Sequence, residues 1–239
     1  RNPQTGRINR KKFPKSRPQT AAELALKFAE LGPVLVFCSE VRLVKAVANA
    51  LRSRLDLSKL SGEGIPPCFQ NTINTRSAIL AEEWLGEEHF VTLSLKSGLA
   101  VHYGPLPEIV RNAIETDFRQ RNFRVLIATN TLAQGVNLPI RTVIVHSCWR
   151  YIEREGEPGE REQISARDYW NIAGRAGRAG QETEGLIIHI IESDQDRSDF
   201  DYYLSKKENV EPVQSALFRR LVELIQSRLS DEALKAELD

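Results

Sequence analysis

Two arginines in a frame of small residues are the side chains in this sequence best suited to phosphate chemistry. Arg175 and Arg178 stand three residues apart in Asn171-Ile-Ala-Gly-Arg-Ala-Gly-Arg178, which we call the arginine segment. Guanidinium groups stay charged and bind phosphate oxygens through planar, paired donors. Glycine and alanine let a ligand approach the backbone closely. The segment therefore predicts a contact with the phosphate chain of a nucleotide, where an arginine stabilises transition-state charge.

The sequence contains no phosphate-binding loop to accompany these arginines. The pattern G-x-x-x-x-G-K-[ST], whose backbone amides cradle nucleotide phosphates, is absent from all 239 residues. The chain also begins with arginine and contains no methionine. We therefore expect a fragment of a longer protein, in which another part holds most of the nucleotide.

A second polar segment follows an apolar run that predicts a central strand. It is Ala128-Thr-Asn-Thr-Leu-Ala-Gln-Gly-Val-Asn-Leu-Pro139, which we call the threonine segment. Ligands bind at the carboxyl ends of strands in open α/β sheets. Its hydroxyl and amide donors suit a sugar-phosphate backbone, and its later glycine and asparagine leave room and a polar group for a nucleotide. These residues are Thr129, Asn130, Thr131, Gly135 and Asn137. An ordinary capped strand-to-helix turn is the alternative.

Short apolar runs alternate with helical patterns through most of the chain. Strands are predicted at 34–38, 99–101, 124–128, 142–145 and 186–191, each buried. The chain is therefore predicted to be an α/β protein, with a parallel sheet and helices on both faces. Thr20 and Glu23 form the pattern of a capping box for the first helix, and Ser165 predicts a cap for the helix that leads into the arginine segment.

Composition divides the chain into three parts, at 1–19, 20–193 and 194–239. The first carries seven basic side chains and no acid, and it predicts either a solvated linker or a phosphate-contacting arm. The remainder is net acidic, so a nucleic-acid surface must be a local groove. No apolar run reaches about 18 residues, which predicts no membrane span. Three distant cysteines favour a reducing, cytoplasmic compartment and predict no metal site.

Four segments in this order resemble motifs of the superfamily 2 helicases. The threonine and arginine segments resemble motifs V and VI, and their sequences are most similar to those of the Ski-type (superkiller-like) branch. Residues 34–39 are similar to motif IV, and 99–106 resembles a histidine-containing segment of that branch. The resemblance covers about 20–193. It implies a second RecA-like (helicase C-terminal) lobe of the P-loop NTPase type.

The resemblance implies that ATP, with Mg²⁺, is clasped between this lobe and a first lobe that carries the Walker A loop and the acidic metal motif. The chain alone would then be inactive, and the parent would move 3′→5′ along nucleic acid. Arg175 and Arg178 would contact the γ-phosphate, and Gly135, Asn137 and Asn171 would border the nucleotide. Residues matching strand contacts are Ser39, Arg42, His102, Thr129, Asn130 and Thr131.

Two positions depart from the branch. Asn171 stands where the branch usually has glutamine, which is one methylene longer. Tyr103-Gly104-Pro105 replaces the usual His-Ala-Gly after His102.

The region between the two segments predicts a hairpin. Residues 148–162 place a Gly/Pro turn between two strand edges, and the corresponding region of the branch can carry a β-hairpin that parts a duplex. Trp149 and Tyr151 are then candidates for stacking on bases; alternatively, both rings pack the hairpin itself. Helical patterns at 196–207 and 213–229 predict a connector towards a further domain.

Two other classes remain open at this stage. A protein-translocating motor ATPase shares the lobe, but its motif V resembles Gly-Arg-Gly-Thr-Asp rather than Gly135-Val-Asn-Leu-Pro139. A non-catalytic binding or regulatory module could retain the fold, although it would not need Arg175 and Arg178. The sequence does not distinguish DNA from RNA.

Overall fold

The computed structural model describes residues 14–61, 69, 74–133, 138–152, 159–177 and 185–206. Residues 1–207 form one compact unit, and residues 208–239 form another that lies outside the described ranges. The predicted helix at 213–229 therefore lies outside them as well. All that follows concerns the first unit.

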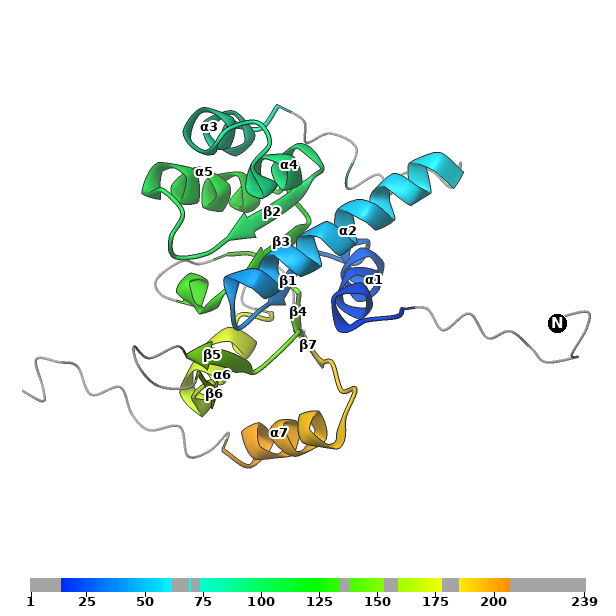
Figure 1. The fold of residues 1–239 in the computed structure, drawn as a ribbon, viewed down its shortest axis with the longest axis vertical. Helices are drawn as coiled ribbons and strands as arrows, with labels where there is room; N and C mark the ends of the chain where they lie inside the picture. Colours follow the sequence, from blue (N-terminus) through cyan, green and yellow to red (C-terminus); the bar gives the residue numbers. More distant parts are fainter. Residues whose placement is uncertain are drawn as a thin grey trace, which may run out of the picture. The chain divides into compact units, whose positions relative to one another are not determined.

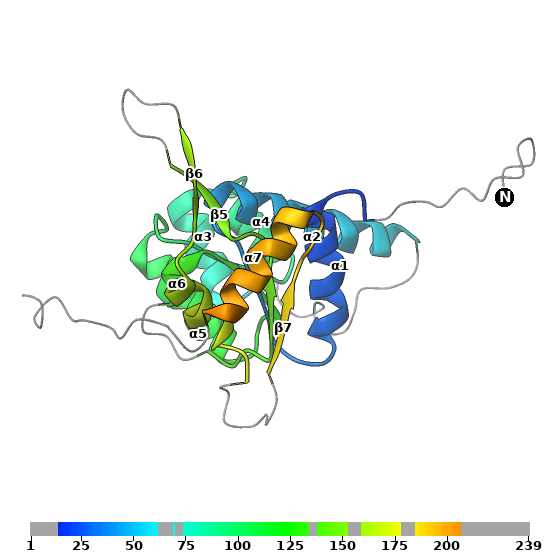
Figure 2. The same cartoon turned by 90° about the horizontal axis from the view of Figure 1, so that it is seen from below.

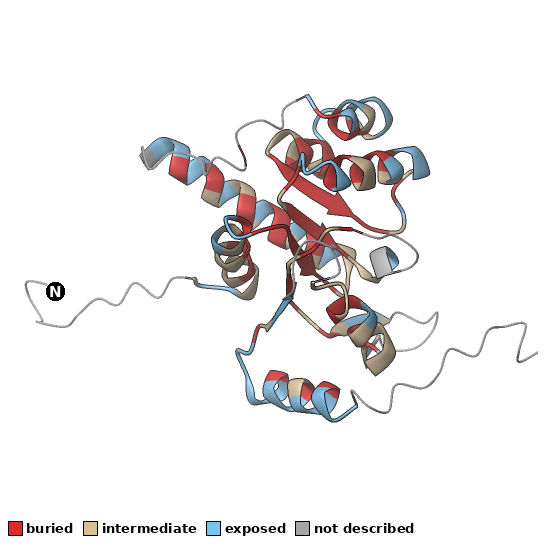
Figure 3. Cartoon of the chain, turned by 180° about the vertical axis from the view of Figure 1, so that it is seen from behind, coloured by how far each residue is buried: buried red, intermediate tan, exposed pale blue. Residues whose placement is uncertain are grey.

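Within the described residues, five parallel strands form one sheet in the order β2-β3-β1-β4-β7 (Figure 1). Every residue of the first four strands is buried, as their unbroken apolar sequences predict. Figure 3 shows them as the buried centre of the fold. The strands are β1 (Val34–Phe37), β2 (Leu99–His102), β3 (Val125–Ala128), β4 (Thr142–Val145) and β7 (Leu186–His189).

Helices flank this sheet (Figures 1 and 2), so the predicted α/β class is confirmed. Helix α1 (Arg17–Ala29) packs on α2 (Val41–Ser61) and on β1, whereas α3, α4 and α5 pack together beside β2. The remaining helices are α3 (Arg76–Leu85), α4 (Phe90–Lys96), α5 (Glu108–Arg119), α6 (Ala166–Ala173), α7 (Asp194–Ser205) and the 3₁₀-helix η2 (Asn130–Ala133). A two-stranded hairpin, β5 (Trp149–Ile152) and β6 (Glu160–Gln163), extends from the body.

The capping box predicted at Thr20 is wrong. Helix α1 begins at Arg17 with Ser16 as its N-cap, and the Thr20 hydroxyl donates to the Ser16 carbonyl oxygen, at 3.3 Å. Proline fits the first turn because no intrahelical partner is needed for its missing N–H, and Pro18 therefore allows the earlier start. Glu23 pairs instead with Arg54 of α2, at 3.0 Å.

Strand β7 is less buried than predicted. Among the described residues it pairs with β4 alone, and it lies at the outer edge of the sheet that they form. Leu186 and Ile187, which point to opposite faces, are 42% and 38% exposed. An apolar run alone does not distinguish an edge strand from a central one.

The predicted strands β1–β4 and the Ser165 cap are confirmed. The Ser165 hydroxyl accepts the Asp168 backbone N–H at 3.1 Å, which fixes the start of α6. Helix α4 was not predicted, and it has only seven residues. Helix α7 lies within the compact unit of residues 1–207, and the division at residue 193 stays a prediction.

No helix in the described ranges is long and apolar enough to cross a membrane. The two described cysteines, Cys38 and Cys148, are buried free thiols.

We expect the sheet to dominate stability. Leu126→Ala in β3, where Leu126 is 1% exposed, should lower the unfolding free energy by about 2–5 kcal/mol through lost burial and a residual cavity. Leu60→Ala is the matched control, because Leu60 is 84% exposed and should change that energy by about 0.5 kcal/mol or less. Urea unfolding of the chain measures both, and equal effects would contradict this assignment of the core.

Candidate nucleotide and nucleic-acid interface

The carboxyl ends of the sheet strands lie side by side at one edge. In the parallel register, His102, Ala128, Phe37, Val145 and His189 occupy one row across β2, β3, β1, β4 and β7. The loops that follow these strands must therefore start from the same edge. This edge gathers the threonine segment and the residues that follow β1 and β2. The arginine segment instead contacts Ile140, which lies on the amino side of β4.

The loops after β2 and β3 contact each other. The Thr129 N–H donates to the His102 carbonyl oxygen at 3.2 Å. A Cβ atom on Gly104 would lie 3.0 Å from Thr131 Cγ2, so a larger residue there would press on the threonine segment. The Thr129 and Thr131 hydroxyls are 3.2 Å apart, and Thr131 is exposed. Together they form a small polar surface, beside Asn130.

His102 points into the protein. Its side chain is 3% exposed, and Nε2 lies 2.9 Å from Glu115 Oε1 of α5 in a hydrogen bond. Burial lowers the pKa of His102, although the Glu115 carboxylate acts in the opposite direction. In this structure the ring therefore offers no surface to a nucleic-acid strand, unlike the predicted contact.

The residues after β1 hold the first strand of the hairpin. The Ser39 hydroxyl donates to the Trp149 carbonyl oxygen, and Glu40 Oε1 accepts the Tyr151 N–H at 2.6 Å. Glu40 also pairs with Arg42, whose side chain is 73% exposed. Two of the predicted nucleic-acid contacts follow β1. Arg42 is accessible, whereas the Ser39 hydroxyl is hydrogen-bonded to β5.

The predicted hairpin is present, with β5 and β6 antiparallel. Trp149 is only partly exposed, because its Nε1–H donates to Asp199 of α7 at 2.5 Å and the Arg161 guanidinium lies 5.1 Å from its ring centroid. Tyr151 is 49% exposed. Tyr151 is therefore the more accessible of the two rings predicted to stack, and residues 153–158 lie outside the described ranges.

The arginine segment is held against the end of the threonine segment. The Gly177 N–H donates to the Ile140 carbonyl oxygen at 3.0 Å, and Ala176 and Ile140 form a parallel β-bridge. Gly177 has φ of +79°, a conformation that favours glycine. A Cβ atom on Gly185 would lie 2.4 Å from the Ala176 carbonyl carbon, so glycine is required for this close approach.

Three predicted nucleotide contacts lie outside the described residues: Arg178, Gly135 and Asn137. Asn171 is exposed on α6, and Arg175 follows this helix and is half-buried. Among the described residues, no group of three His, Cys, Asp or Glu side chains is placed to hold a metal ion.

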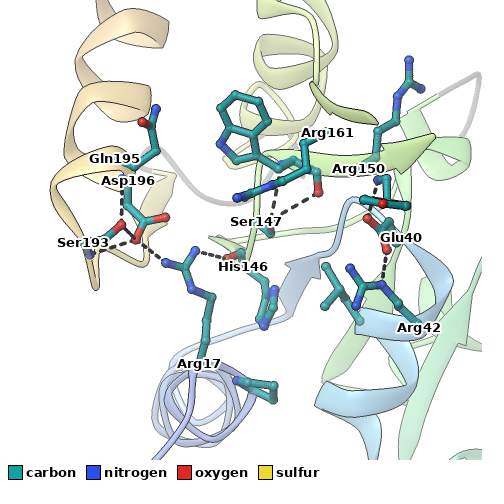
Figure 4. Close-up of a pocket in the computed structure, with 14 residues that line it drawn as sticks. Arg17, Glu40, Arg42, His146, Ser147, Arg150, Arg161, Ser193, Gln195 and Asp196 are labelled. Carbon is teal, nitrogen blue, oxygen red and sulfur yellow. Dashed lines mark hydrogen bonds and ion pairs between the residues drawn. The ribbon is translucent and has the colours of Figure 1, made fainter. Parts of the chain in front are cut away.

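A pocket of about 410 Å³ lies between α1, the end of β1, the hairpin and the start of α7 (Figure 4). Four arginines line it: Arg17, Arg42, Arg150 and Arg161. Arg17 Nη1 donates to the His146 carbonyl oxygen at 3.0 Å, and its guanidinium pairs with Asp196 and Glu192. Partial burial alone would raise the pKa of Asp196, but hydrogen bonds from Arg17 and Ser193 lower it to about 2.

The analysis of the sequence missed Arg17, Asp196 and Asp199. A signal for Asp196 was present, because Ser193-x-x-Asp196 has the spacing of a capping box, and the structure contains that box at the start of α7. Arg17 and Asp196 are 179 residues apart, so no local pattern could pair them.

The family comparisons agree with the geometry. Residues 68–180 match the model of the helicase conserved C-terminal domain. The chain is 34% identical to the Hachiman protein HamB of Bacillus cereus over 219 aligned residues. The alignment covers 87% of this chain and 18% of that protein. The chain is 37% identical over 180 residues to the ATP-dependent DNA helicase Hel308 of Caldivirga maquilingensis, covering 73% of this chain and 22% of that protein.

A third relative is the U5 small nuclear ribonucleoprotein 200 kDa helicase of Caenorhabditis elegans. The identity is 30% over 209 residues, which cover 85% of this chain and 9% of that protein. The chain thus spans less than a quarter of the length of each of these three relatives.

We expect His146, at the end of β4, to make stability depend on pH. Its side chain is buried and both ring nitrogens lack a hydrogen-bond partner among the described residues. Burial, with a smaller contribution from Arg17, lowers the pKa of His146 from 6.5 to about 4. Between these values the unfolded chain binds a proton that the folded chain does not. The unfolding free energy should therefore fall by on the order of 3 kcal/mol as pH drops through this window.

The measurement is chemical unfolding at pH 7, 5.5 and 4 for the wild type and for His146→Leu. The variant removes the titrating ring and leaves no buried polar atom. Its stability should fall less over this window, and the difference between the two proteins isolates His146 from other histidines. Parallel pH profiles would contradict the assignment.

Proposed function

Because this chain belongs to the superfamily 2 helicases as their C-terminal lobe, we propose that it is the second motor lobe of an ATP-dependent, 3′→5′ nucleic-acid helicase or translocase. The observation that carries the proposal is the junction of the arginine and threonine segments at Ile140. This junction places the backbone beside Arg175 against the residue that follows the threonine segment, so the proposed nucleotide contact and strand contact belong to neighbouring segments.

The nucleotide side of the proposal rests on the arginine segment. Glycine and alanine at 174, 176 and 177 allow close backbone contacts with Ile140 and Gly185, and Arg175 lies within this frame. ATP would supply the free energy for movement, and the proposed first lobe would hold most of it together with Mg²⁺. Arg175 and Arg178 would orient and neutralise terminal phosphate oxygens. Asn171, Gly135 and Asn137 would border the rest of the nucleotide.

The strand side rests on the carboxyl edge of the sheet. Thr129 and Thr131 present hydroxyl groups beside β3, and Arg42 presents an exposed cation near the end of β1. Asn130 lies between the two threonines, and its amide oxygen is buried without a hydrogen-bond partner among the described residues. Hydroxyl and guanidinium groups suit the sugar-phosphate backbone rather than base edges. We infer that they hold one strand without reading its sequence. The hairpin beside them would then part a duplex, with Tyr151 as its accessible stacking residue.

Two other classes are less well supported. A protein-translocating lobe would carry a different threonine segment, and the relatives named above include a DNA helicase and a small nuclear ribonucleoprotein helicase. A non-catalytic module would not require the tight junction at Gly177. The relatives include both DNA and RNA helicases. The substrate class can therefore be determined by comparing how strongly single-stranded DNA and single-stranded RNA each stimulate ATP hydrolysis.

The arginines provide the direct test. In the whole protein that carries this lobe, Arg178→Ala and Arg175→Ala should each lower nucleic-acid-stimulated ATP hydrolysis by about 10³-fold or more, because each removes a charge that stabilises the transition state. Binding of single-stranded nucleic acid should be retained, since the strand contacts lie on other residues. Steady-state ATPase and fluorescence anisotropy measure the two properties.

Arg76→Ala is the matched control. Arg76 is an exposed arginine in the first turn of α3, outside both segments, and its loss should leave ATP hydrolysis unchanged. The assignment fails if both arginine variants hydrolyse ATP as the wild type does, or if nucleic-acid binding is lost in parallel with hydrolysis.

A further inference from the structure

One buried carboxylate holds both strands of the hairpin. Asp199 in α7 is 3% exposed. Its Oδ2 accepts the Trp149 Nε1–H at 2.5 Å, and its Oδ1 accepts the Gln163 side-chain amide at 3.2 Å. Trp149 opens β5 and Gln163 closes β6, and the two face each other as a cross-strand pair. Asp199 therefore grips the hairpin at its base, on both strands at once.

The bonding of Asp199 indicates an orienting role. None of the ion pairs found among the described residues includes this carboxylate, and its third donor is the Gln195 amide at 2.9 Å. A buried charge without a cation must be stabilised by directed hydrogen bonds. Such bonds add little net stability compared with apolar packing, but they fix the direction of their donors.

Helix α7 also holds the helix that leads into the arginine segment. Tyr203, one helical turn after Asp199, stacks on Tyr169 of α6, with ring centroids 4.1 Å apart and planes within 6°. Its hydroxyl donates to the Ile164 carbonyl oxygen at 2.8 Å, between β6 and α6. The Trp170 indole N–H donates to the Tyr203 carbonyl oxygen at 3.0 Å. The hairpin and α6 thus share one support.

The start of α7 is fixed in turn to the body of the lobe. Arg17 of α1 pairs with Asp196 in the first turn of α7 and also donates to the end of β4 (Figure 4). Asp196 completes the capping box with Ser193. Helix α7 is therefore anchored at its first turn by α1, and it carries Asp199 and Tyr203 on its buried side.

We propose that Asp199 is a positioning residue, which locks the strand-separating hairpin to α7 and thereby to the helix of the arginine segment. The inference rests on the proposed function. It adds a route by which the movement of this lobe on ATP binding would be transmitted to the hairpin at the duplex. Movement of α6 with the arginines would carry α7, and Asp199 would transmit that movement to both hairpin strands. Without this grip the motor would still hydrolyse ATP on a single strand, but its hairpin would meet the duplex in a less defined position.

The test compares duplex unwinding with ATP hydrolysis in the whole protein. Asp199→Asn keeps the size and shape of the side chain but places an amide NH₂ against indole or amide donors. Unwinding of a 3′-tailed duplex, in DNA and in RNA versions, should fall about tenfold or more, as for small misplacements of a positioned group. ATP hydrolysis stimulated by single strands should stay within about twofold of wild type, because the arginines are unchanged.

Trp149→Phe provides an independent second variant. It removes the N–H that Asp199 accepts and keeps an aromatic ring beside Arg161. It should therefore also lower duplex unwinding while leaving ATP hydrolysis close to the wild-type rate. The double variant should unwind no worse than the poorer single variant, since both changes break one contact. Asp201→Asn is the matched control: Asp201 is exposed on the same helix, and its variant should unwind as the wild type does.

Each outcome decides something. Normal unwinding by Asp199→Asn overturns the inference and leaves the proposed function intact. Equal losses of unwinding and hydrolysis, together with a lowered melting temperature, also overturn it, because Asp199 would then serve stability alone. A wild-type protein without nucleic-acid-stimulated ATP hydrolysis would overturn the proposed function itself, and the inference with it.

Discussion

Backbone hydrogen bonds between parallel strands bring the threonine segment and the residues that follow β1, β2 and β4 to one edge of the sheet. Because β1, β2, β3, β4 and β7 run in the same direction and in register, the loops that leave them start at a common edge. Residues 39 and 129, separated by 90 positions in the chain, thereby leave adjacent strands. The largely apolar sequences of β1–β4 suit burial on both faces of the sheet, and the ladders of backbone hydrogen bonds hold the strands in this register.

The elements of this sheet could be predicted from the sequence because their signals are local. A short run of mainly apolar residues indicates a strand, although not its degree of burial, and Ser165 followed by Asp168 indicates a helix start. Where the prediction was wrong, a second local signal competed: Pro18 allowed α1 to begin before the Thr20 pattern. The exposure of β7 depends on its place in the strand order, which no run of residues encodes.

The candidate site was predictable in part. The arginine and threonine segments could be recognised from the sequence. Their junction at Ile140 could not, because it depends on how the strands and α6 are arranged in space. The exposed or buried state of single residues could not be predicted. Trp149 is turned towards α7 by Asp199, and His102 is turned inward by Glu115. Both partners come from other elements. The sequence pattern therefore identifies the residue but does not predict the direction of its side chain.

Acidic side chains organise a surface that is proposed to bind an anion. Glu40 positions Arg42 and the hairpin, Asp196 positions Arg17, and Asp199 positions the two hairpin strands. A net acidic lobe is thus compatible with a local basic groove, because many of its carboxylates serve as internal hydrogen-bond acceptors.

We propose that this chain is half of a nucleotide-driven motor and needs another lobe for chemistry. The most direct test of this proposal is ATP hydrolysis by the isolated chain and by the whole protein, each with single-stranded DNA and with single-stranded RNA. We expect nucleic acid to stimulate ATP hydrolysis by the whole protein clearly and not to stimulate it in the isolated chain. Stimulated turnover by the isolated chain would contradict the proposal.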